Sequence, residues 1–143
     1  MKSGRSIAQF PVPETVGARD WGEETLLATS SGNFTLKKLF IKAGAKGGLQ
    51  YHRKKDECGY VISGRMIIRY DNGAGTLVEK EVGPGDTFLF PQHSVHQEEA
   101  VEDTVIIEAS TPFLNDRVRV EEDYGQEISG GLPTTSEKDI IEL

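Results

Sequence analysis

The sequence lacks the features that mark several protein classes. Its 143 residues contain one cysteine, Cys58, so no internal disulfide bond can form, and we expect this side chain to be a small buried one. No apolar run approaches the roughly 18 residues that a membrane-spanning helix needs. A charged-then-apolar leader is also missing, because the apolar stretch at residues 7–12 is short and interrupted by proline. These features predict a cytoplasmic protein that does not contact a membrane.

Positive charge is also scarce, and it is unevenly placed. The net charge is −7, and residues 121–143 hold seven acidic residues and one lysine. Without a sustained basic stripe or an aromatic platform, the chain is not expected to bind nucleic acid. Residues 37–55 nevertheless carry seven basic residues and no acid. This segment either favours an anionic small molecule or is a solvated strand edge in which lysines prevent aggregation.

What the chain does contain is a series of short strand patterns separated by turns. The length corresponds to one domain, and no window shows a helical period. We expect strands at residues 25–29, 34–41, 50–52, 57–62, 65–70, 76–82, 87–90, 95–99, 104–110 and 117–121. Such spacing is typical of an all-β sandwich or barrel. The predicted organisation is an N-terminal arm at 1–24, a barrel at 25–125 and a loose acidic tail at 126–143.

Four polar residues are spaced as metal ligands within these strands. Gln50 and His52 are two residues apart, so in an extended strand they point to the same face. Glu57 would return from the next strand and His96 from a neighbouring one. Two nitrogens and two oxygens form a plausible first shell for a divalent zinc, iron, manganese, cobalt or nickel ion.

The same residues resemble the two sequence motifs of the cupin superfamily, which are small jelly-roll barrels. The first motif is matched from Gly44 through Gln50, His52 and Glu57 to Gly64, and the second from Gly85 through Pro91 to His96. Gln50 stands where the first histidine is usual, and His93 stands where a glycine is usual. The resemblance implies a cupin jelly-roll β-barrel with one metal ion, zinc being the first choice.

Within the cupins, the chain is similar to the mannose-6-phosphate isomerase domain over roughly residues 19–125. The matching positions are Trp21-Gly22, Phe34 to Lys37, Leu49 to His52, Val61 to Gly64, and Asp116, Val118, Arg119, Glu121, Tyr124 and Gly125. Gln126 departs from the arginine usual there, and Lys55 stands where arginine is often found.

This resemblance implies a metal-dependent aldose–ketose isomerase that acts through a metal-stabilised enediolate. His93 is the first candidate for the acid–base residue, although an exposed loop histidine is the alternative. Lys37 would serve if it were buried, although a strand-edge lysine is the alternative. Arg119 is expected to hold an anionic group of the substrate, and its alternative is a salt bridge to Glu121 or Glu122.

Two other functions remain open from the sequence, together with the assembly. Cupins include metal-dependent dioxygenases, against which the neutral ligand Gln50 argues, and non-catalytic carbohydrate-binding proteins, with which the short chain is compatible. The expected ligand is an anionic sugar or sugar phosphate. Because cupins often pair through sheet edges and exchanged N-terminal arms, we expect a homodimer.

Overall fold

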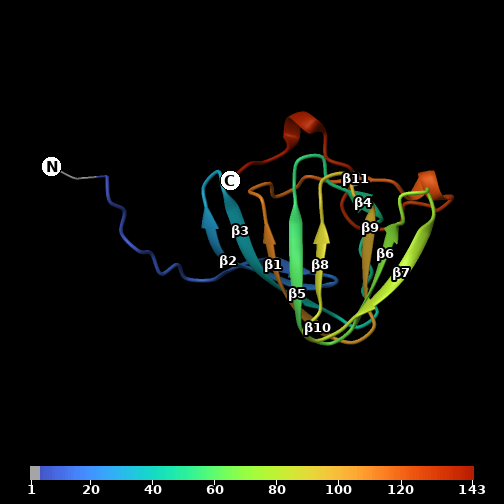
Figure 1. Cartoon of the computed structure of the whole chain (residues 1–143), viewed down its shortest axis with the longest axis horizontal. Coiled ribbons are helices and arrows are strands. Elements are labelled where there is room, and N and C mark those ends of the chain that lie inside the picture. The colour runs from blue at the N-terminus through green and yellow to red at the C-terminus, as the bar shows by residue number, and fades with distance from the viewer. Residues whose placement is uncertain (1–3) are drawn as a thin grey trace.

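Short antiparallel strands make up most of the computed structural model, which describes residues 4–143, with residues 17 and 18 described only by their backbone (Figure 1). The strands are β1 (Glu14–Arg19), β2 (Gly22–Ser30), β3 (Phe34–Ile41), β4 (Gln50–Tyr51), β5 (Glu57–Ser63), β6 (Met66–Asp71), β7 (Leu77–Val82), β8 (Thr87–Phe90), β9 (His96–Ala100), β10 (Thr104–Ser110) and β11 (Val118–Arg119). Two short 3₁₀ helices follow, η1 (Glu121–Tyr124) and η2 (Glu137–Asp139).

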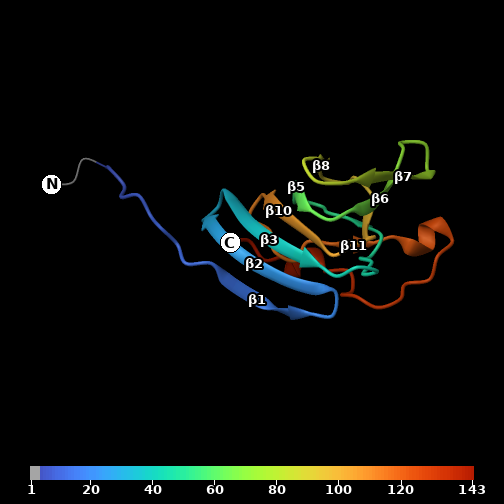
Figure 2. The ribbon, with the colours of Figure 1, turned by 90° about the horizontal axis from the view of Figure 1, so that it is seen from below.

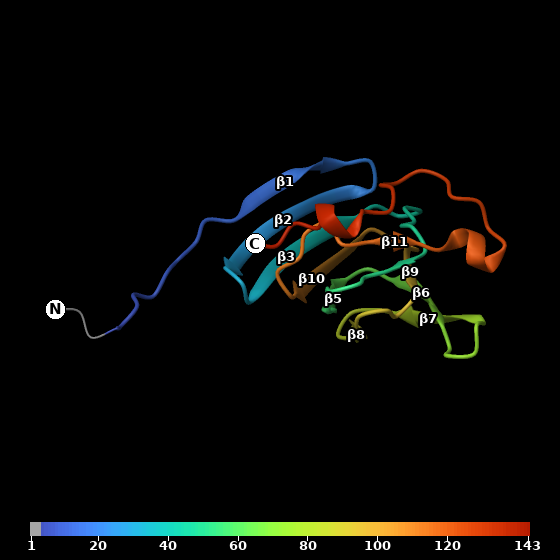
Figure 3. The ribbon, with the colours of Figure 1, turned by 90° about the horizontal axis from the view of Figure 1, so that it is seen from above.

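The strands form two sheets that face each other. The larger sheet has the order β1-β2-β3-β10-β5-β8, and the smaller has the order β11-β4-β9-β6-β7. Figures 2 and 3 show the sheets curving around one interior, with β1 to β3 on one side and β6 to β8 on the other. Neighbouring strands pair antiparallel although many are distant in sequence, as in a double-sheet jelly roll. The predicted all-β jelly-roll fold is confirmed.

The strand register arranges the inward-facing side chains in layers. Residues paired directly across two strands point to the same face of the sheet, and so does every second residue along one strand. One layer contains Gln50, Glu57, His96 and Ser110; the next contains Lys37, Gly59, Glu98 and Glu108; the third contains Leu39, Val61, Ala100 and Ile106. The first two layers are polar and the third is apolar, so one half of the interior is built for polar chemistry.

The apolar half contains the hydrophobic core. Its buried members are Ile41, Val61, Met66, Ile68, Val82, Phe88, Phe90, Ala100 and Ile106. At that end of the barrel, Gly64 makes the tight turn predicted between β5 and β6 with a φ of 90°. A Cβ atom there would lie 2.3 Å from the backbone oxygen of Asp103, so the turn requires glycine.

Both predicted flanking segments contain more structure than expected. Strand β1 and the start of β2 lie within the residues predicted as the N-terminal arm, and only residues 4–13 extend away from the barrel (Figure 1). In the tail, the N–H of Thr135 donates to the carbonyl of Arg117, and Phe113 bridges to Glu142. The tail is therefore tied to the barrel by its backbone. Among the described residues, no helix is long and apolar enough to cross a membrane.

One side chain expected inside lies outside. Cys58 is exposed, as is its neighbour on the same face, Tyr60, at 45%. Glu57 and Val61 face the interior on the same strand, so the alternation of β5 places Cys58 and Tyr60 on the outer face. The expected burial of Cys58 was wrong because the strand is apolar enough on either face to allow the opposite assignment.

Candidate metal centre

Three of the four predicted metal ligands converge inside the barrel. His52, Glu57 and His96 each offer a ligand atom, and these atoms lie within 4.8 Å of one another. Glu57 begins β5 and His96 begins β9, so the ligands come from both sheets. All three are buried, with exposed fractions of 3%, 5% and 2% in that order. A divalent ion held there would be screened from bulk water on most sides.

Backbone carbonyls fix the protons of both imidazoles. The Nδ1–H of His52 donates to the carbonyl of Asp116 at 2.5 Å, and the Nδ1–H of His96 donates to that of Ser94 at 2.9 Å. A carbonyl can only accept, so each neutral imidazole carries its proton on Nδ1 and presents the Nε2 lone pair. The ring of Phe90 stacks on that of His96 at 3.8 Å and holds its plane.

The two Nε2 atoms face one carboxylate oxygen, and this arrangement fits a cation. Glu57 Oε1 lies 3.3 Å from His52 Nε2 and 3.5 Å from His96 Nε2. Three lone-pair acceptors directed at one another repel unless a positive charge lies among them. Two ligands each about 2.1 Å from a zinc ion are themselves roughly 3.0–3.5 Å apart, which matches these separations.

The second oxygen of Glu57 is held by Lys55. The Nζ of Lys55 lies 3.1 Å from Glu57 Oε2, and both side chains are buried. Burial alone would raise the pKa of Glu57, but the charge of Lys55 lowers it well below its usual value. Burial would lower the pKa of Lys55, and the carboxylates of Glu57 and Glu108 raise it instead. Glu57 is therefore ionised, with one oxygen oriented and the other left for a metal ion.

Asp116 holds the loop that carries His52 and Lys55. Its carboxylate accepts the backbone N–H groups of Arg53 at 3.1 Å, Lys54 at 2.6 Å and Lys55 at 2.9 Å. Burial would raise the pKa of Asp116, and these hydrogen bonds lower it overall. The same residue therefore orients His52 through its backbone and the loop through its side chain.

Gln50 occupies a position suited to the fourth ligand. It lies directly opposite His96 in the β4–β9 pairing, where side chains share a face. Its assignment as a ligand stays a prediction.

Two further carboxylates lie next to the centre. Glu98 and Glu108 place oxygens within 4.8 Å of each other and of a Glu57 oxygen. Burial first, and then the charge of Glu57, raises the pKa of Glu98 to about 7 and that of Glu108 well above its usual value. Burial therefore favours the protonated form of both carboxyl groups, and Glu98 titrates close to neutral pH. No hydrogen bond or ion pair to either side chain is found among the described residues.

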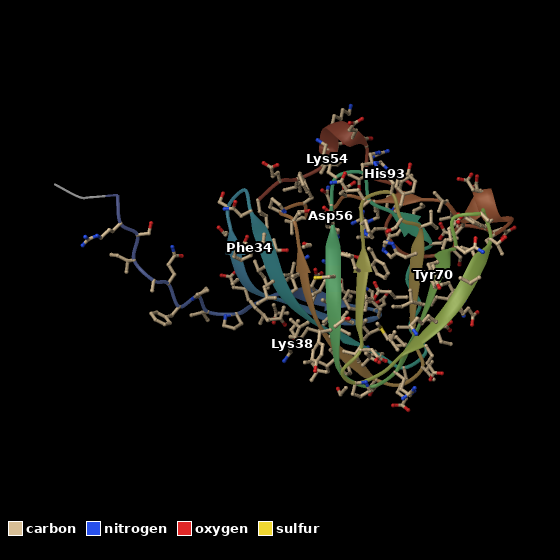
Figure 4. All side chains as sticks on the ribbon, in the orientation of Figure 1. Phe34, Lys38, Lys54, Asp56, Tyr70 and His93 are labelled. Atoms are coloured by element: carbon tan, nitrogen blue, oxygen red, sulfur yellow. The ribbon has the colours of Figure 1, made fainter. Side chains whose placement is uncertain are left out.

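His93 lies at the end of the barrel and is not part of the cluster. Its side chain is exposed, and Figure 4 shows it near Lys54 at the same end of the molecule. Its φ of 65° is the left-handed conformation that the usual glycine adopts readily. The ring lies 5.6 Å from that of Tyr51. A catalytic role for His93 stays a prediction that this position does not favour.

Lys37 and Arg119, the other predicted catalytic residues, are both engaged in ion pairs. Lys37 Nζ lies 2.7 Å from Glu24 Oε1. Arg119 pairs with Glu121, and its Nη1 donates to the carbonyls of Gly130 and Leu132 at 3.0 Å each. The pairing with Glu121 is the alternative that the sequence offered for Arg119, although the pair is buried and not at the surface.

Sequence reasoning assigned no role to four residues that complete the site: Lys55, Glu98, Glu108 and Asp116. Glu98 follows His96 by two residues, so its inward direction was implied by that of His96. Glu108 was harder to identify, because Val105 and Ile107 are as apolar as Ile106 and the pattern does not tell which face of β10 is buried.

Comparisons with known proteins agree with this fold. The family model described as "Cupin domain" matches residues 39–109, which contain His52, Glu57 and His96. A germin-like protein 3-7 from Oryza sativa subsp. japonica is 29% identical over 73 residues, or 51% of this chain and 31% of that protein. A germin-like protein of subfamily 2 from Arabidopsis thaliana is 34% identical over 55 residues, or 36% and 25%. The chain thus matches less than a third of the length of either relative.

Solved structures show the same fold at low sequence identity. KdgF from Halomonas sp. has a TM-score of 0.60 and 21% identity, covering 68% of this chain and 86% of that one. An RmlC-like cupin from Shewanella frigidimarina has a TM-score of 0.56 and 19% identity, covering 86% and 96%. The capsular polysaccharide assembling protein CapF from Staphylococcus aureus has a TM-score of 0.59 and 20% identity, covering 71% and 28%.

Proposed function

Because the chain carries a cupin domain, we propose that it is a metal-dependent isomerase that interconverts an aldose and a ketose, in the manner of mannose-6-phosphate isomerase. The observation that carries this proposal is the set of His52 Nε2, His96 Nε2 and Glu57 Oε1, which are directed at one another in a buried site. Adjacent carboxyl groups and basic residues provide the polar surroundings that a sugar needs.

The ligands of the ion would be Gln50, His52, Glu57 and His96. Zinc suits a set of two imidazoles and two oxygens, and iron, manganese, cobalt and nickel accept the same donors. When bound, the ion would supply Lewis-acid polarisation of the sugar's carbonyl and hydroxyl oxygens.

The residues of the chain would orient the sugar and move its proton. Isomerisation transfers a proton between neighbouring carbons, which needs an acid–base group within hydrogen-bond reach. His93 remains the residue that the sequence suggests, but Glu108 is the better placed, since its carboxyl group lies next to Glu57 and is not engaged by the described residues. The apolar third layer would keep water away from the far side of the sugar.

A non-catalytic carbohydrate-binding protein is the second candidate. The observation in its favour is that two of the three predicted catalytic side chains are occupied, Lys37 by Glu24 and Arg119 by Glu121. Such a protein would hold the sugar at the same site without removing a proton from carbon.

Proton exchange with solvent distinguishes the two candidates. Metal-loaded protein is incubated with mannose 6-phosphate and, separately, with fructose 6-phosphate in heavy water, and the products are followed by NMR. The isomerase should place deuterium on the carbon next to the carbonyl and convert one sugar into the other, and Glu57→Gln should abolish both changes. Sugar that binds without gaining deuterium would support the non-catalytic candidate and contradict the isomerase.

The assembly and location that we propose are a homodimer and the cytoplasm. Large apolar side chains gather on the outer face of the larger sheet, namely Phe34, Tyr60, Ile62 and Leu89, which are 45–65% exposed. The extending arm adds Ile7, Phe10 and Val12, which are at least 81% exposed. A second copy of the chain would cover these groups.

A further inference from the structure

Basic residues gather where one edge of each sheet meets the C-terminal segment. Residues 130–135 run from the β11 side of the smaller sheet towards the turn between β1 and β2 of the larger one (Figure 3). Arg119 donates to the carbonyls of Gly130 and Leu132, and Arg53 Nη1 donates to that of Thr135 at 2.6 Å. The segment, here called the strap, is therefore fastened by arginines that belong to the smaller sheet and its loops.

The acidic residues in this region are already engaged. Glu24 accepts both Lys37 at 2.7 Å and Arg19 at 3.5 Å, one on each oxygen. Glu121 accepts Arg119 through both of its oxygens. Asp116 accepts three backbone N–H groups. Each of these three carboxylates therefore already has partners within the described residues.

Two arginines of this region, Arg53 and Arg117, pair with no carboxylate among the described residues, and Arg117 makes the longer contacts of the two. Its Nη1 donates to the carbonyl of Pro133 at 3.2 Å and to Thr135 Oγ1 at 3.3 Å, both long contacts to neutral groups. Within residues 4–143, no carboxylate oxygen lies within 4.0 Å of its guanidinium group. The residue is half-buried, and it precedes Arg119 by two positions, so both project towards the same side of the smaller sheet.

The electrostatic surroundings of Arg117 agree with this arrangement. Burial first lowers the pKa of Arg117, and the charges of Arg119 and Arg19 lower it further, while Asp116 and Glu24 only partly oppose them. A guanidinium group that remains charged among other cations gains from an added anion.

We propose that Arg117 forms a binding site for the oxyanion of a sugar ligand, either a phosphate ester or a carboxylate. The planar guanidinium group offers the paired donors that such anions accept. The identity of the ligand as a sugar rests on the proposed function; the anion site itself rests on the unpaired arginine.

One neighbouring residue connects this site to the metal centre. Arg117 directly follows Asp116, whose backbone carbonyl accepts the Nδ1–H of His52. The anion site and the metal centre are therefore neighbours along the chain, which suits a ligand that carries both a sugar carbonyl and an anionic group.

The test measures the binding of inorganic phosphate to metal-free protein by calorimetry, with acetate as a second anion. Arg117→Gln should weaken phosphate binding by about 10- to 100-fold, because a neutral donor replaces a charged one. Arg117→Lys, which keeps the charge, should lie between Arg117→Gln and the wild type. The matched control is Arg65→Gln, which removes an exposed arginine paired with Glu81 and should bind phosphate as the wild type does. The anion that binds more tightly, phosphate or acetate, identifies the class of oxyanion.

The variant Thr135→Val distinguishes two causes of weaker phosphate binding, a loosened strap and a lost anion site. This change removes the Oγ1 contact of Arg117 but leaves its guanidinium group in place, so phosphate binding should stay within about twofold of the wild type. Equal phosphate binding by wild type and Arg117→Gln, or no binding by the wild type, would overturn the proposal. Because metal-free protein is used, an absence of isomerase activity would leave this result unaffected.

Discussion

At the scale of single residues, the centre depends on how each ligand atom is oriented. Hydrogen bonds from Nδ1 to backbone carbonyls direct both Nε2 atoms inward, and Lys55 holds one oxygen of Glu57 so that the other faces them. Such outer contacts fix ligand geometry and contribute to metal affinity. The residues around the ligands therefore matter almost as much as the ligands.

Lys55→Met is expected to weaken metal binding by about 10- to 100-fold, the usual cost of losing an outer-shell partner. Glu57 Oε2 would be left buried without its ammonium partner, and the carboxylate could then rotate. Metal affinity is measured by competition with a chromogenic chelator. Lys54→Met is the matched control, since Lys54 is the exposed neighbour and its side chain makes no ion pair among the described residues. Unchanged affinity in Lys55→Met would show that Lys55 does not position Glu57.

The metal-free protein is expected to lose stability as the pH rises from about 4.5 through 7. Burial and the charge of Glu57 raise the pKa of Glu98 to about 7 and that of Glu108 well above normal. The folded state then binds more protons than the unfolded state in this window, so the free energy of unfolding falls as the pH increases.

Urea denaturation of the metal-free protein across this pH range measures the effect. The Glu98→Gln, Glu108→Gln double variant should show a flatter profile, whereas Glu122→Gln, which changes an exposed residue, should follow the wild type. A wild-type profile that rises with pH would contradict the assigned protonation of the two carboxyl groups.

At the scale of elements, the loop between β4 and β5 is shaped by a residue that is distant in sequence. Asp116 accepts three consecutive backbone N–H groups of this loop and lies just before β11. The loop carries both His52 and Lys55, which contact the two oxygens of Glu57. The metal centre is therefore built partly by the pairing of β4 with β11.

Asp116→Asn is expected to lower the free energy of unfolding by about 1–3 kcal/mol, because the amide leaves buried N–H groups of the loop without full partners. Metal affinity should fall as well, since His52 moves with the loop. Asp86→Asn is the control: Asp86 accepts the N–H of Gly83 in a turn elsewhere in the chain, so its loss should leave metal affinity unchanged. A stable Asp116→Asn protein with wild-type affinity would refute the role assigned to this residue.

The elements also show which features of the fold could be predicted from the sequence alone. The strand and turn pattern predicted an all-β sandwich or barrel, and the resemblance to the cupin motifs, which include Gly64, Gly85 and the ligand positions, implied the jelly roll. Strand β1 was not predicted, because its pairing partner β2, and not its own pattern, makes residues 14–19 a strand. The strap was also missed, since the residues at 130–135 have no periodicity and are held by arginines from elsewhere in the chain.

The interior shows the same limit. Arg117 and Arg119 are equivalent in sequence, and only the fold decides that Glu121 pairs with Arg119 and leaves Arg117 without a carboxylate. Glu108 could not be assigned to the interior because both faces of β10 are apolar. Ligand spacing is a local property that a sequence carries, whereas the choice of partner for a buried charge depends on tertiary structure.

At the scale of the whole molecule, one face is suited to self-association. Ile62 and Leu89 lie on the outer face of β5 and β8 and are 48% and 65% exposed. Sedimentation velocity is expected to show a homodimer, and Ile62→Lys, Leu89→Lys should shift it to the monomer. Val101→Lys, at an exposed apolar residue between β9 and β10, is the control and should remain dimeric. A monomeric wild type at high concentration would contradict the proposed assembly.

The central claim is that His52, Glu57 and His96 hold one divalent cation inside the barrel. The most direct measurement is the metal content of purified protein after dialysis, determined by plasma mass spectrometry for the wild type and for Glu57→Gln. The account predicts one tightly held ion per chain in the wild type and almost none in the variant, with both proteins folded. Wild-type protein that retains no ion after incubation with zinc, iron, manganese, cobalt or nickel would contradict it, as would a variant that retains the full complement.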